Sequence, residues 1–205
     1  MNIIGRHFVL FMTAFISVIS TEPSVAQKTE DQQKRPDMAK LRELANPGPE
    51  HDKLEKYAGK WQLKVIIGDG DSAAETNGRA NSYMTLERRF LWLGYNVDRK
   101  SGRTKGSFTI GFDRRNDRYS LVAMDTYGTY FVTSHGKKEE KSGRIRLHGT
   151  DDDPYMKSMG YDKEFLHVID FTKPDEFTIE VYFIDTRTSE RKENKAMTFQ
   201  FTRTK

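Results

Sequence analysis

The feature that most constrains the fold of this chain is a long succession of short strand-like segments. From Trp61 to Ile67, large apolar side chains alternate with polar ones, which is the period of a strand that buries one face. Similar segments recur at short spacing and end at clusters of Gly, Asn, Asp or Pro, which favour turns. We expect about ten strands in all. After the first, they are predicted over 78–88, 90–98, 106–113, 118–126, 129–137, 144–150, 164–171, 176–185 and 195–203.

The connections between these segments favour tight reversals rather than crossovers. No segment between them is long and periodic enough to form a crossover helix, so consecutive strands should pair antiparallel. A meander of this kind is best closed into an up-and-down barrel, because closure leaves no exposed sheet edge. The predicted fold class is therefore all-β. The turn sequences are Lys100-Ser101-Gly102, Arg114-Arg115-Asn116-Asp117, Lys141-Ser142-Gly143 and Lys173-Pro174-Asp175.

A short helix is predicted immediately before the first strand. Pro49 fits the first helical position, where no amide donor is needed, and acidic residues follow where the positive helix end favours them. Leu54 and Tyr57 lie three residues apart and share a face that can cover one end of a core. Gly59 then provides a helix stop. The barrel domain, including this helix, is expected to span 47–205.

The first residues have the pattern of a targeting segment. Over 1–26, Arg6 precedes the apolar run 8–19, and the small residues Ser24-Val25-Ala26 follow where signal peptidase cuts. A membrane anchor is the alternative, but the run is shorter than the roughly 20 residues that span a bilayer. We therefore expect a cleaved signal, a periplasmic or secreted protein, and no stable membrane insertion after cleavage. The chain has no cysteine, so it forms no disulfide and has no thiol for lipid attachment.

The charged residues point to solubility rather than to a charged partner. The formal net charge is +4, but basic and acidic residues are interspersed and no helix carries a basic stripe, so nucleic acid is not an expected partner. Residues 27–46 are polar and are predicted to form a flexible arm. A partner-binding helix is the alternative there, because Met38, Leu41 and Leu44 have helix-like spacing.

Several short motifs are distributed along the predicted barrel. They are Pro47-Gly48-Pro49-Glu50-His51 with Gly59-x-Trp61, Arg89-Phe90-Leu91 with Tyr95, Gly111-Phe112-Asp113, Tyr119, Asp125-Thr126, and Phe201-Thr202-Arg203. Together they resemble the bacterial family called domain of unknown function 1579, over residues 47–205. The resemblance implies a lipocalin-like barrel and carries no settled activity. It also implies that Arg203 lies over the Trp61 ring, a structural cation–π contact.

Two ionisable residues are predicted on inward, apolar strand faces. Asp125 shares a face with Tyr119, Leu121 and Ala123, and a buried carboxylate needs a partner, for which Arg89 is the candidate. Asp125 is interpreted as a polar anchor in a ligand cavity. The alternatives are an ion pair that fixes the barrel register and an Asp at a strand end facing water.

His167 shares a face with Phe165, Ile169 and Phe171. It is interpreted as a ligand contact, and the alternative is a core histidine bonded to a neighbour. Haem-binding proteins of related architecture use a histidine, so haem stays an alternative occupant, although nothing in the sequence requires a cofactor. The expected ligand-binding residues are Arg89, Tyr95, Asp125, Thr126 and His167.

Catalytic and metal motifs are weak in this sequence. Ser134 and His135 are adjacent on a strand and must point to opposite faces, so they do not form a dyad. The histidines are scattered without zinc-site spacing, and no metal site is expected. Glu50 and His51 are explained by helix capping and packing, with a gate over the cavity as the alternative.

The prediction from sequence is thus an exported barrel that binds a small, partly apolar molecule. An enzyme that uses Asp125 or His167 as a base is one alternative. A filled barrel that serves as an envelope interaction module is another.

Overall fold

The computed structural model describes residues 37–99, 102–159, 163–187 and 189–205. The chain divides into two compact units, 1–36 and 37–205, and the second unit is described below. The predicted signal, 1–26, and the first part of the predicted arm, 27–36, lie outside the described residues, as do Lys100 and Ser101 of one predicted turn.

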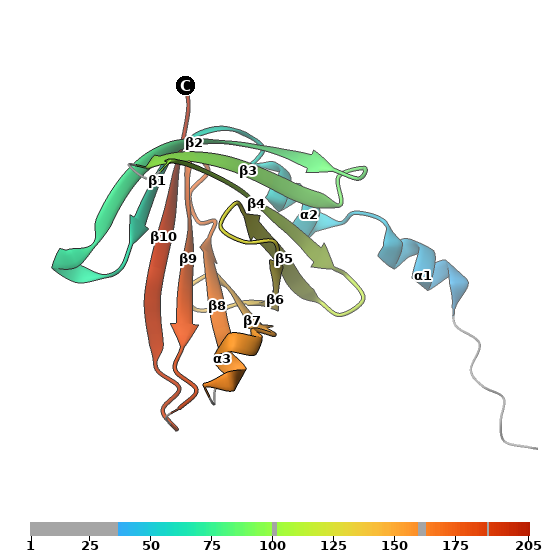
Figure 1. The fold of residues 1–205 in the computed structure, drawn as a ribbon. Coiled ribbons are helices and arrows are strands. Elements are labelled where there is room, and N and C mark those ends of the chain that lie inside the picture. The colour runs from blue at the N-terminus through green and yellow to red at the C-terminus, as the bar shows by residue number, and fades with distance from the viewer. Residues whose placement is uncertain (1–36, 100–101, 160–162, 188) are drawn as a thin grey trace, which may run out of the picture. The chain divides into compact units, whose positions relative to one another are not determined.

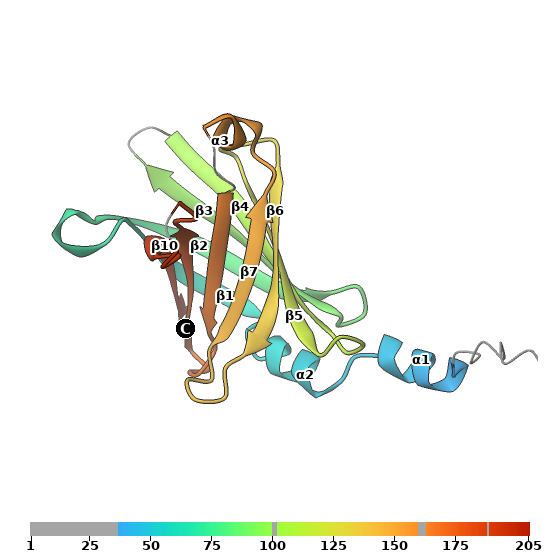
Figure 2. The ribbon, with the colours of Figure 1, turned by 90° about the horizontal axis from the view of Figure 1, so that it is seen from below.

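Ten strands form one closed antiparallel barrel in the described part of the chain (Figures 1 and 2). Each strand pairs with its neighbours in sequence, and β1 closes the barrel by pairing with β10, with Trp61 opposite Arg203. The all-β up-and-down fold is confirmed. The strands are β1 Gly59–Ile67, β2 Ala74–Thr85, β3 Phe90–Arg99, β4 Gly102–Asp113, β5 Arg118–Asp125, β6 Phe131–Lys138, β7 Ile145–Asp151, β8 Lys163–Asp170, β9 Glu176–Ile184 and β10 Glu193–Arg203. Two short helical segments, η1 Gly70–Ser72 and α3 Pro154–Ser158, lie in connections.

The second strand differs from its expected bounds. It begins at Ala74 rather than Gly78 and ends at Thr85, because the next three residues turn the chain with left-handed backbones. Leu86, Glu87 and Arg88 have φ angles of 48°, 54° and 65°, which strand pairing does not accommodate. This turn places the Arg88 guanidinium against Asp52 and Glu55 of the helix before β1.

Part of the segment expected to be a flexible arm forms a helix, α1 Met38–Ala45. Asp37 caps it by accepting hydrogen bonds from the backbone N–H groups of Ala39 and Lys40. The Arg114 guanidinium, in the β4–β5 turn, donates to the Glu43 carbonyl at the other end of α1. None of the described helices is both long and apolar enough to cross a membrane.

The predicted helix before β1 is present as α2 Pro49–Glu55, with Pro49 in its first turn. His51 lies in the first turn and its Nδ1 accepts a hydrogen bond of 3.0 Å from the Gly48 backbone N–H, so the capping role expected for His51 is confirmed. Leu54 and Tyr57 are buried in the barrel core, as their spacing predicts. Figure 2 shows α2 at the end of the barrel where β1 begins and α3 at the opposite end. We call these the α2 end and the far end.

The predicted contact between Trp61 and Arg203 is confirmed. The guanidinium carbon of Arg203 lies 4.3 Å from the centre of the Trp61 ring, and Arg203 also donates to the Lys56 and Ala58 carbonyls. A Cβ atom at Gly59 would lie 2.7 Å from Arg203 Nη1, and the φ of Gly59 is +147°. Because Gly59 has no side chain, Arg203 of the last strand can approach the chain segment that joins α2 to β1 and hydrogen-bond its carbonyl groups.

Inward side chains fill the middle of the barrel, which we call the packed middle. Leu121, Leu147, Ile169 and Ile179 are all fully buried there. Leu121 and Ile169 belong to the inward faces predicted for β5 and β8, and both are confirmed as core residues. The packed middle separates the two ends of the barrel interior.

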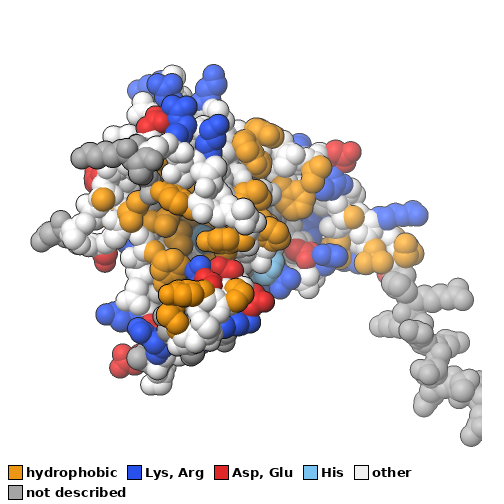
Figure 3. Space-filling model, viewed as in Figure 1, with side chains coloured by type: hydrophobic (Ala, Val, Ile, Leu, Met, Phe, Trp, Pro, Cys, Tyr) orange, Lys and Arg blue, Asp and Glu red, His pale blue; other side chains and the backbone are white. Residues whose placement is uncertain are grey.

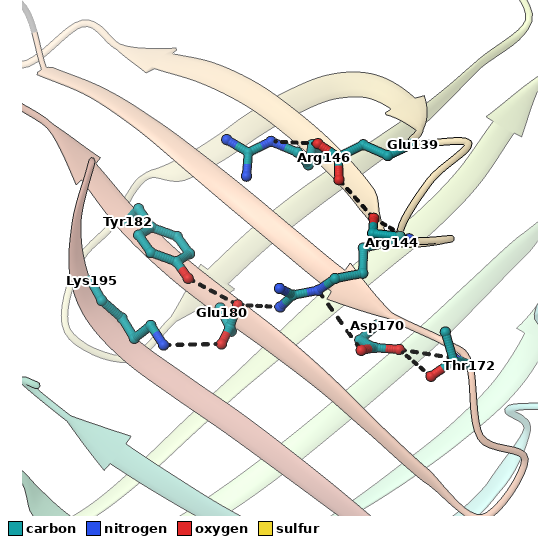
Figure 4. A network of polar contacts seen from close by, with 9 residues as sticks. Glu139, Arg144, Arg146, Asp170, Thr172, Glu180, Tyr182 and Lys195 are labelled. Carbon is teal, nitrogen blue, oxygen red and sulfur yellow. Dashed lines mark hydrogen bonds and ion pairs between the residues drawn. The ribbon is translucent and has the colours of Figure 1, made fainter. Parts of the chain in front are cut away.

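A polar network covers part of the outer surface (Figure 4). Glu180 on β9 accepts hydrogen bonds from Arg144, Tyr182 and Lys195, and these contacts lower its pKa although burial opposes the shift. On the same outer side of the sheet, Leu166 is fully buried. Leu166 belongs to an outward apolar cluster with Val168 and Ile184, and Tyr182 of the network packs against this cluster. The network therefore helps to shield the cluster rather than to form a cavity.

Candidate functional site

A cavity of about 150 Å³ opens inside the barrel at its far end. It begins where the packed middle stops, because the next inward positions of β5 and β9 carry the smaller Ala123 and Val181. An unfilled interior volume counts against the interpretation of a completely filled barrel. The cavity is lined by Tyr95, Phe108, Ala123, Met124, Asp125, Tyr130, Val132, Lys163, Phe165, His167, Val181, Phe183, Met197 and Phe199.

Three aromatic rings form one wall of the cavity. Phe108 lies 5.6 Å from Tyr95 and 5.1 Å from Phe199, and Tyr95 and Phe199 are 5.3 Å apart, measured between ring centres. All three side chains are buried. A cavity of this volume accepts about one benzene-sized ring, and aromatic walls favour an apolar or aromatic occupant.

His167 provides a buried polar atom in this apolar site. Its Nδ1 lies 3.1 Å from Ser134 Oγ, and this is the only hydrogen bond of the His167 side chain among the described residues. Burial lowers the pKa of His167 to about 4, so the imidazole is neutral at pH 7. With Nδ1 engaged by Ser134, Nε2 is the nitrogen that remains for an occupant of the cavity.

Lys163 brings a positive charge to the same cavity. Its Nζ lies 3.0 Å from Asp151 Oδ2 and 3.6 Å from Asp153 Oδ2, and it sits 5.6 Å from the centre of the Tyr130 ring. Burial opposes the charged form, but the hydrogen bond and charge of Asp151 outweigh it and raise the pKa of Lys163. The sequence prediction missed Lys163 because it began the strand at Glu164. The same alternation that places Phe165 and His167 inward would have found it.

Three of the five residues predicted to bind a ligand line this one cavity: Tyr95, Asp125 and His167. Asp125 lies at the end of β5, is largely exposed, and accepts a hydrogen bond of 2.8 Å from the Tyr127 backbone N–H. It therefore belongs to the mouth of the cavity rather than to its interior. Thr126 does not line this cavity. Its Oγ1 accepts a hydrogen bond from the Lys105 backbone N–H beside an outer groove.

The expected pair between Arg89 and Asp125 is wrong. Arg89 precedes β3 at the α2 end, where its guanidinium lies 2.8 Å from Glu87 and donates to backbone carbonyls of the β2–β3 turn. The strand register explains the error, because Phe90 is opposite Gly111 on β4, whereas Asp125 is opposite Gly106. Sequence alternation fixes the face of a side chain but not its height along the barrel.

The polar groups of the cavity suit binding better than proton transfer. Ser134 and His135 do point to opposite faces, as predicted, and His135 bonds Ser120 on the outer surface. Ser134 instead bonds His167, but no carboxylate hydrogen-bonds His167 among the described residues, and its lowered pKa makes it a weak base. Nor does any group of three or more His, Cys, Asp or Glu side chains in the described ranges have an arrangement that could hold a metal ion.

Comparisons with known proteins support the fold. The sequence model of a family described as "Protein of unknown function (DUF1579)" matches residues 46–203. Among solved structures, the crystal structure of Rv2717c from M. tuberculosis is similar, with a TM-score of 0.50 and 12% sequence identity, covering 78% of this chain and 100% of that chain. At this identity the likeness concerns the fold alone. No functionally curated protein matches the chain.

Proposed function

The chain belongs to the DUF1579 family of proteins of unknown function, and from this premise we propose that it binds a small, partly apolar molecule in the far-end cavity. The observation that carries the proposal is the unfilled volume of about 150 Å³ in a barrel whose middle is fully packed. Apolar cavities with a few convergent polar groups are the usual form of small-molecule sites.

The lining of the cavity restricts the chemistry of its occupant. The wall of Tyr95, Phe108 and Phe199 accepts one ring or a short branched chain. His167 is neutral at pH 7, so it offers one hydrogen bond to a neutral polar group. Lys163 is already paired with Asp151, so it adds little attraction for an anion. A ring that bears one hydroxyl or carbonyl group fits these constraints.

Phenol and benzene are suitable probes for this proposal, because they differ only in the hydroxyl group. We expect phenol to shift the backbone NMR signals of Tyr95, Phe165 and His167, and to bind about tenfold more tightly than benzene through one hydrogen bond. The variant A123L fills the cavity and should abolish both effects. The variant A74L adds the same side chain at an exposed position of β2 and should leave them unchanged. Equal phenol binding by A123L and A74L would refute the proposal.

We also propose that the protein is exported and that residues 1–26 are removed. The support is the sequence pattern of Arg6, the apolar run 8–19 and Ser24-Val25-Ala26. Expression of the full chain in a bacterium should give a periplasmic or secreted product whose first residue is Gln27, measured by intact mass. The variant A26F should block cleavage at this position. A wild-type product that starts at Met1 in the cytoplasm would contradict export.

A further inference from the structure

A second and larger cavity, of about 410 Å³, lies at the α2 end of the barrel. It is bounded by α2 and the residues that follow it, by the start of β5, by the β6–β7 connection with the strand residues beside it, and by the β8–β9 connection, so its walls come from four separate parts of the sequence. The volume falls in the range of small-molecule sites. The residues that line it are Lys53, Leu54, Lys56, Tyr57, Tyr119, Lys138, Gly143, Ile145, Phe171, Thr172 and Pro174.

The apolar lining of this α2-end cavity belongs to the barrel core. Leu54, Tyr57 and Ile145 are buried, and the Tyr57 ring stacks on Phe171 with 4.1 Å between ring centres. The Tyr57 hydroxyl donates to the Phe171 carbonyl, and the Tyr119 hydroxyl donates to Glu50. Both tyrosine hydroxyls are therefore engaged, and the lining presents mainly carbon atoms to an occupant.

Three lysines also line the α2-end cavity, and all three are exposed residues. Lys53 is paired with Glu50. The ammonium groups of Lys56 and Lys138 form no ion pair and no hydrogen bond with any described residue. Lys53, Tyr119 and the charge of Lys138 lower the pKa of Glu50 although burial opposes this, so Glu50 is ionised and one of the three positive charges is compensated. The cavity thus keeps an excess of positive charge beside an apolar surface.

We propose that the α2-end cavity binds a small amphipathic anion, a molecule with one carboxylate or sulfonate group and an apolar body. The anionic group lies at Lys56 and Lys138, and the apolar body covers Tyr57, Ile145 and Phe171. An inorganic anion would leave this apolar surface unused, and a neutral apolar molecule would gain no attraction from the two ammonium groups.

This site is distinct from the far-end cavity. Along β5 the inward residues are Tyr119 in the α2-end cavity, Leu121 in the packed middle and Ala123 in the far-end cavity. Along β8, Ile169 lies between Phe171 of the α2-end cavity and His167 of the far-end cavity in the same way. The packed middle separates the two cavities, so each can be tested without the other.

Octanoate and 1-octanol are the probes that test this proposal, by calorimetry and NMR on the full chain. Octanoate should bind the wild-type protein at least tenfold more tightly than 1-octanol and shift the signals of Tyr57, Ile145 and Phe171. The double variant K56E/K138E should weaken octanoate binding at least tenfold. The matched control K60E/K192E reverses two exposed lysines that line neither cavity, so octanoate affinity should stay within twofold of wild type.

The far-end variant A123L distinguishes this proposal from the proposed function. It should bind octanoate as the wild type does, while it loses phenol binding. Octanoate binding that is absent in the wild type, unchanged in K56E/K138E, or lost in A123L would overturn the α2-end site. K56E/K138E should keep wild-type phenol binding, so a failure of the far-end proposal and a failure of the α2-end proposal give different results.

Discussion

The two ends of the barrel are built from the same strands, but they are covered in different ways. At the α2 end, the Phe177 ring stacks on Phe201 and meets Trp61 edge to face, with 4.3 Å and 4.8 Å between ring centres, and Tyr57, which follows α2, packs against Phe177. At the far end, the β5–β6 and β7–β8 connections leave large side chains in solvent, including Tyr127 and Tyr155, which are 64% and 70% exposed. Figure 3 shows hydrophobic side chains gathered on this face, around α3.

This difference shows that strand alternation and the covering of the barrel ends are separate determinants of the structure. Alternation turns the same kinds of side chain inward at both ends. The covering of the α2 end depends on contacts between residues that are distant in sequence, such as Arg203 over Trp61 and Arg88 with Asp52. At the far end, the described connections leave large side chains exposed, and the interior contains the cavity of about 150 Å³. We therefore expect stability to depend mainly on the α2 end, and binding of a small, neutral, partly apolar molecule to depend on the far end.

The strongest test of this difference compares two aromatic truncations. Trp61 is 1% exposed and its Nε1 donates a hydrogen bond of 2.9 Å to Ser82, so W61A should lower the free energy of unfolding by about 3–5 kcal/mol. Phe183 at the far end is 45% exposed, so F183A should cost about 1 kcal/mol or less. Urea unfolding measures both. Equal losses would mean that the far end contributes as much to stability as the α2 end.

Acid should destabilise the protein through the far-end cavity. The pKa of His167 is about 4 in the folded protein and about 6.5 in the unfolded chain, so only the unfolded chain takes up this proton between those pH values. This contribution to stability is complete above pH 6.5 and is lost as the pH falls toward 4. The total loss is about 3 kcal/mol.

The variant H167Q isolates this effect, because it removes the titrating group. The difference in unfolding free energy between wild type and H167Q should change by about 3 kcal/mol between pH 7 and pH 4. The control H135Q changes an exposed histidine on the outer surface and should follow the wild-type curve. A difference that does not vary with pH would show that His167 is not held neutral by burial.

The next effect concerns the last residue of β10. R203K keeps the positive charge but loses the planar guanidinium that lies over Trp61 and donates to the Lys56 and Ala58 carbonyls. We expect a loss of about 1–2 kcal/mol in urea unfolding. Phenol affinity at the far end should be unchanged in the folded fraction. A parallel loss of phenol affinity would show that the two ends are coupled through the packed middle.

The smallest expected effect compares the caps of the two N-terminal helices. H51A removes the acceptor for the Gly48 N–H in α2 and should cost about 1 kcal/mol in barrel stability. D37A removes the cap of α1, in which no residue is buried, and should leave barrel unfolding almost unchanged. Urea unfolding of both variants measures the difference. A larger loss in D37A would mean that α1 contributes to the fold as α2 does.

The sequence predicted most of the barrel because its strong signals are local. The alternation from Trp61 to Ile67 and turns such as 114–117 act within one hairpin, and the pairing of consecutive strands follows from them. The contact between Trp61 and Arg203 was found only through the family resemblance. Helix α1 was considered only as an alternative to a flexible arm, because its stabilising contacts are an Asp37 cap and a distant arginine, Arg114, rather than a buried apolar face.

The candidate site was harder to predict, because it depends on height along the barrel as well as on face. Tyr95 and His167 line the same cavity, whereas Arg89 lies at the other end of the barrel. Glycines were also overlooked as part of the site. A Cβ atom at Gly106 would lie 2.3 Å from the Tyr95 hydroxyl oxygen, so the absence of a side chain there allows the Tyr95 ring to occupy its position in the cavity wall. Such close approaches between neighbouring strands follow from register, which composition does not reveal.

Native mass spectrometry of the protein isolated from its own cells tests the central claim most directly, that the far-end cavity binds a small, partly apolar molecule. The wild type and A74L should carry a non-covalently bound small molecule that denaturation releases and that A123L lacks. A neutral small molecule that stays bound in A123L, or a bare mass for the wild type in every preparation, would contradict the claim.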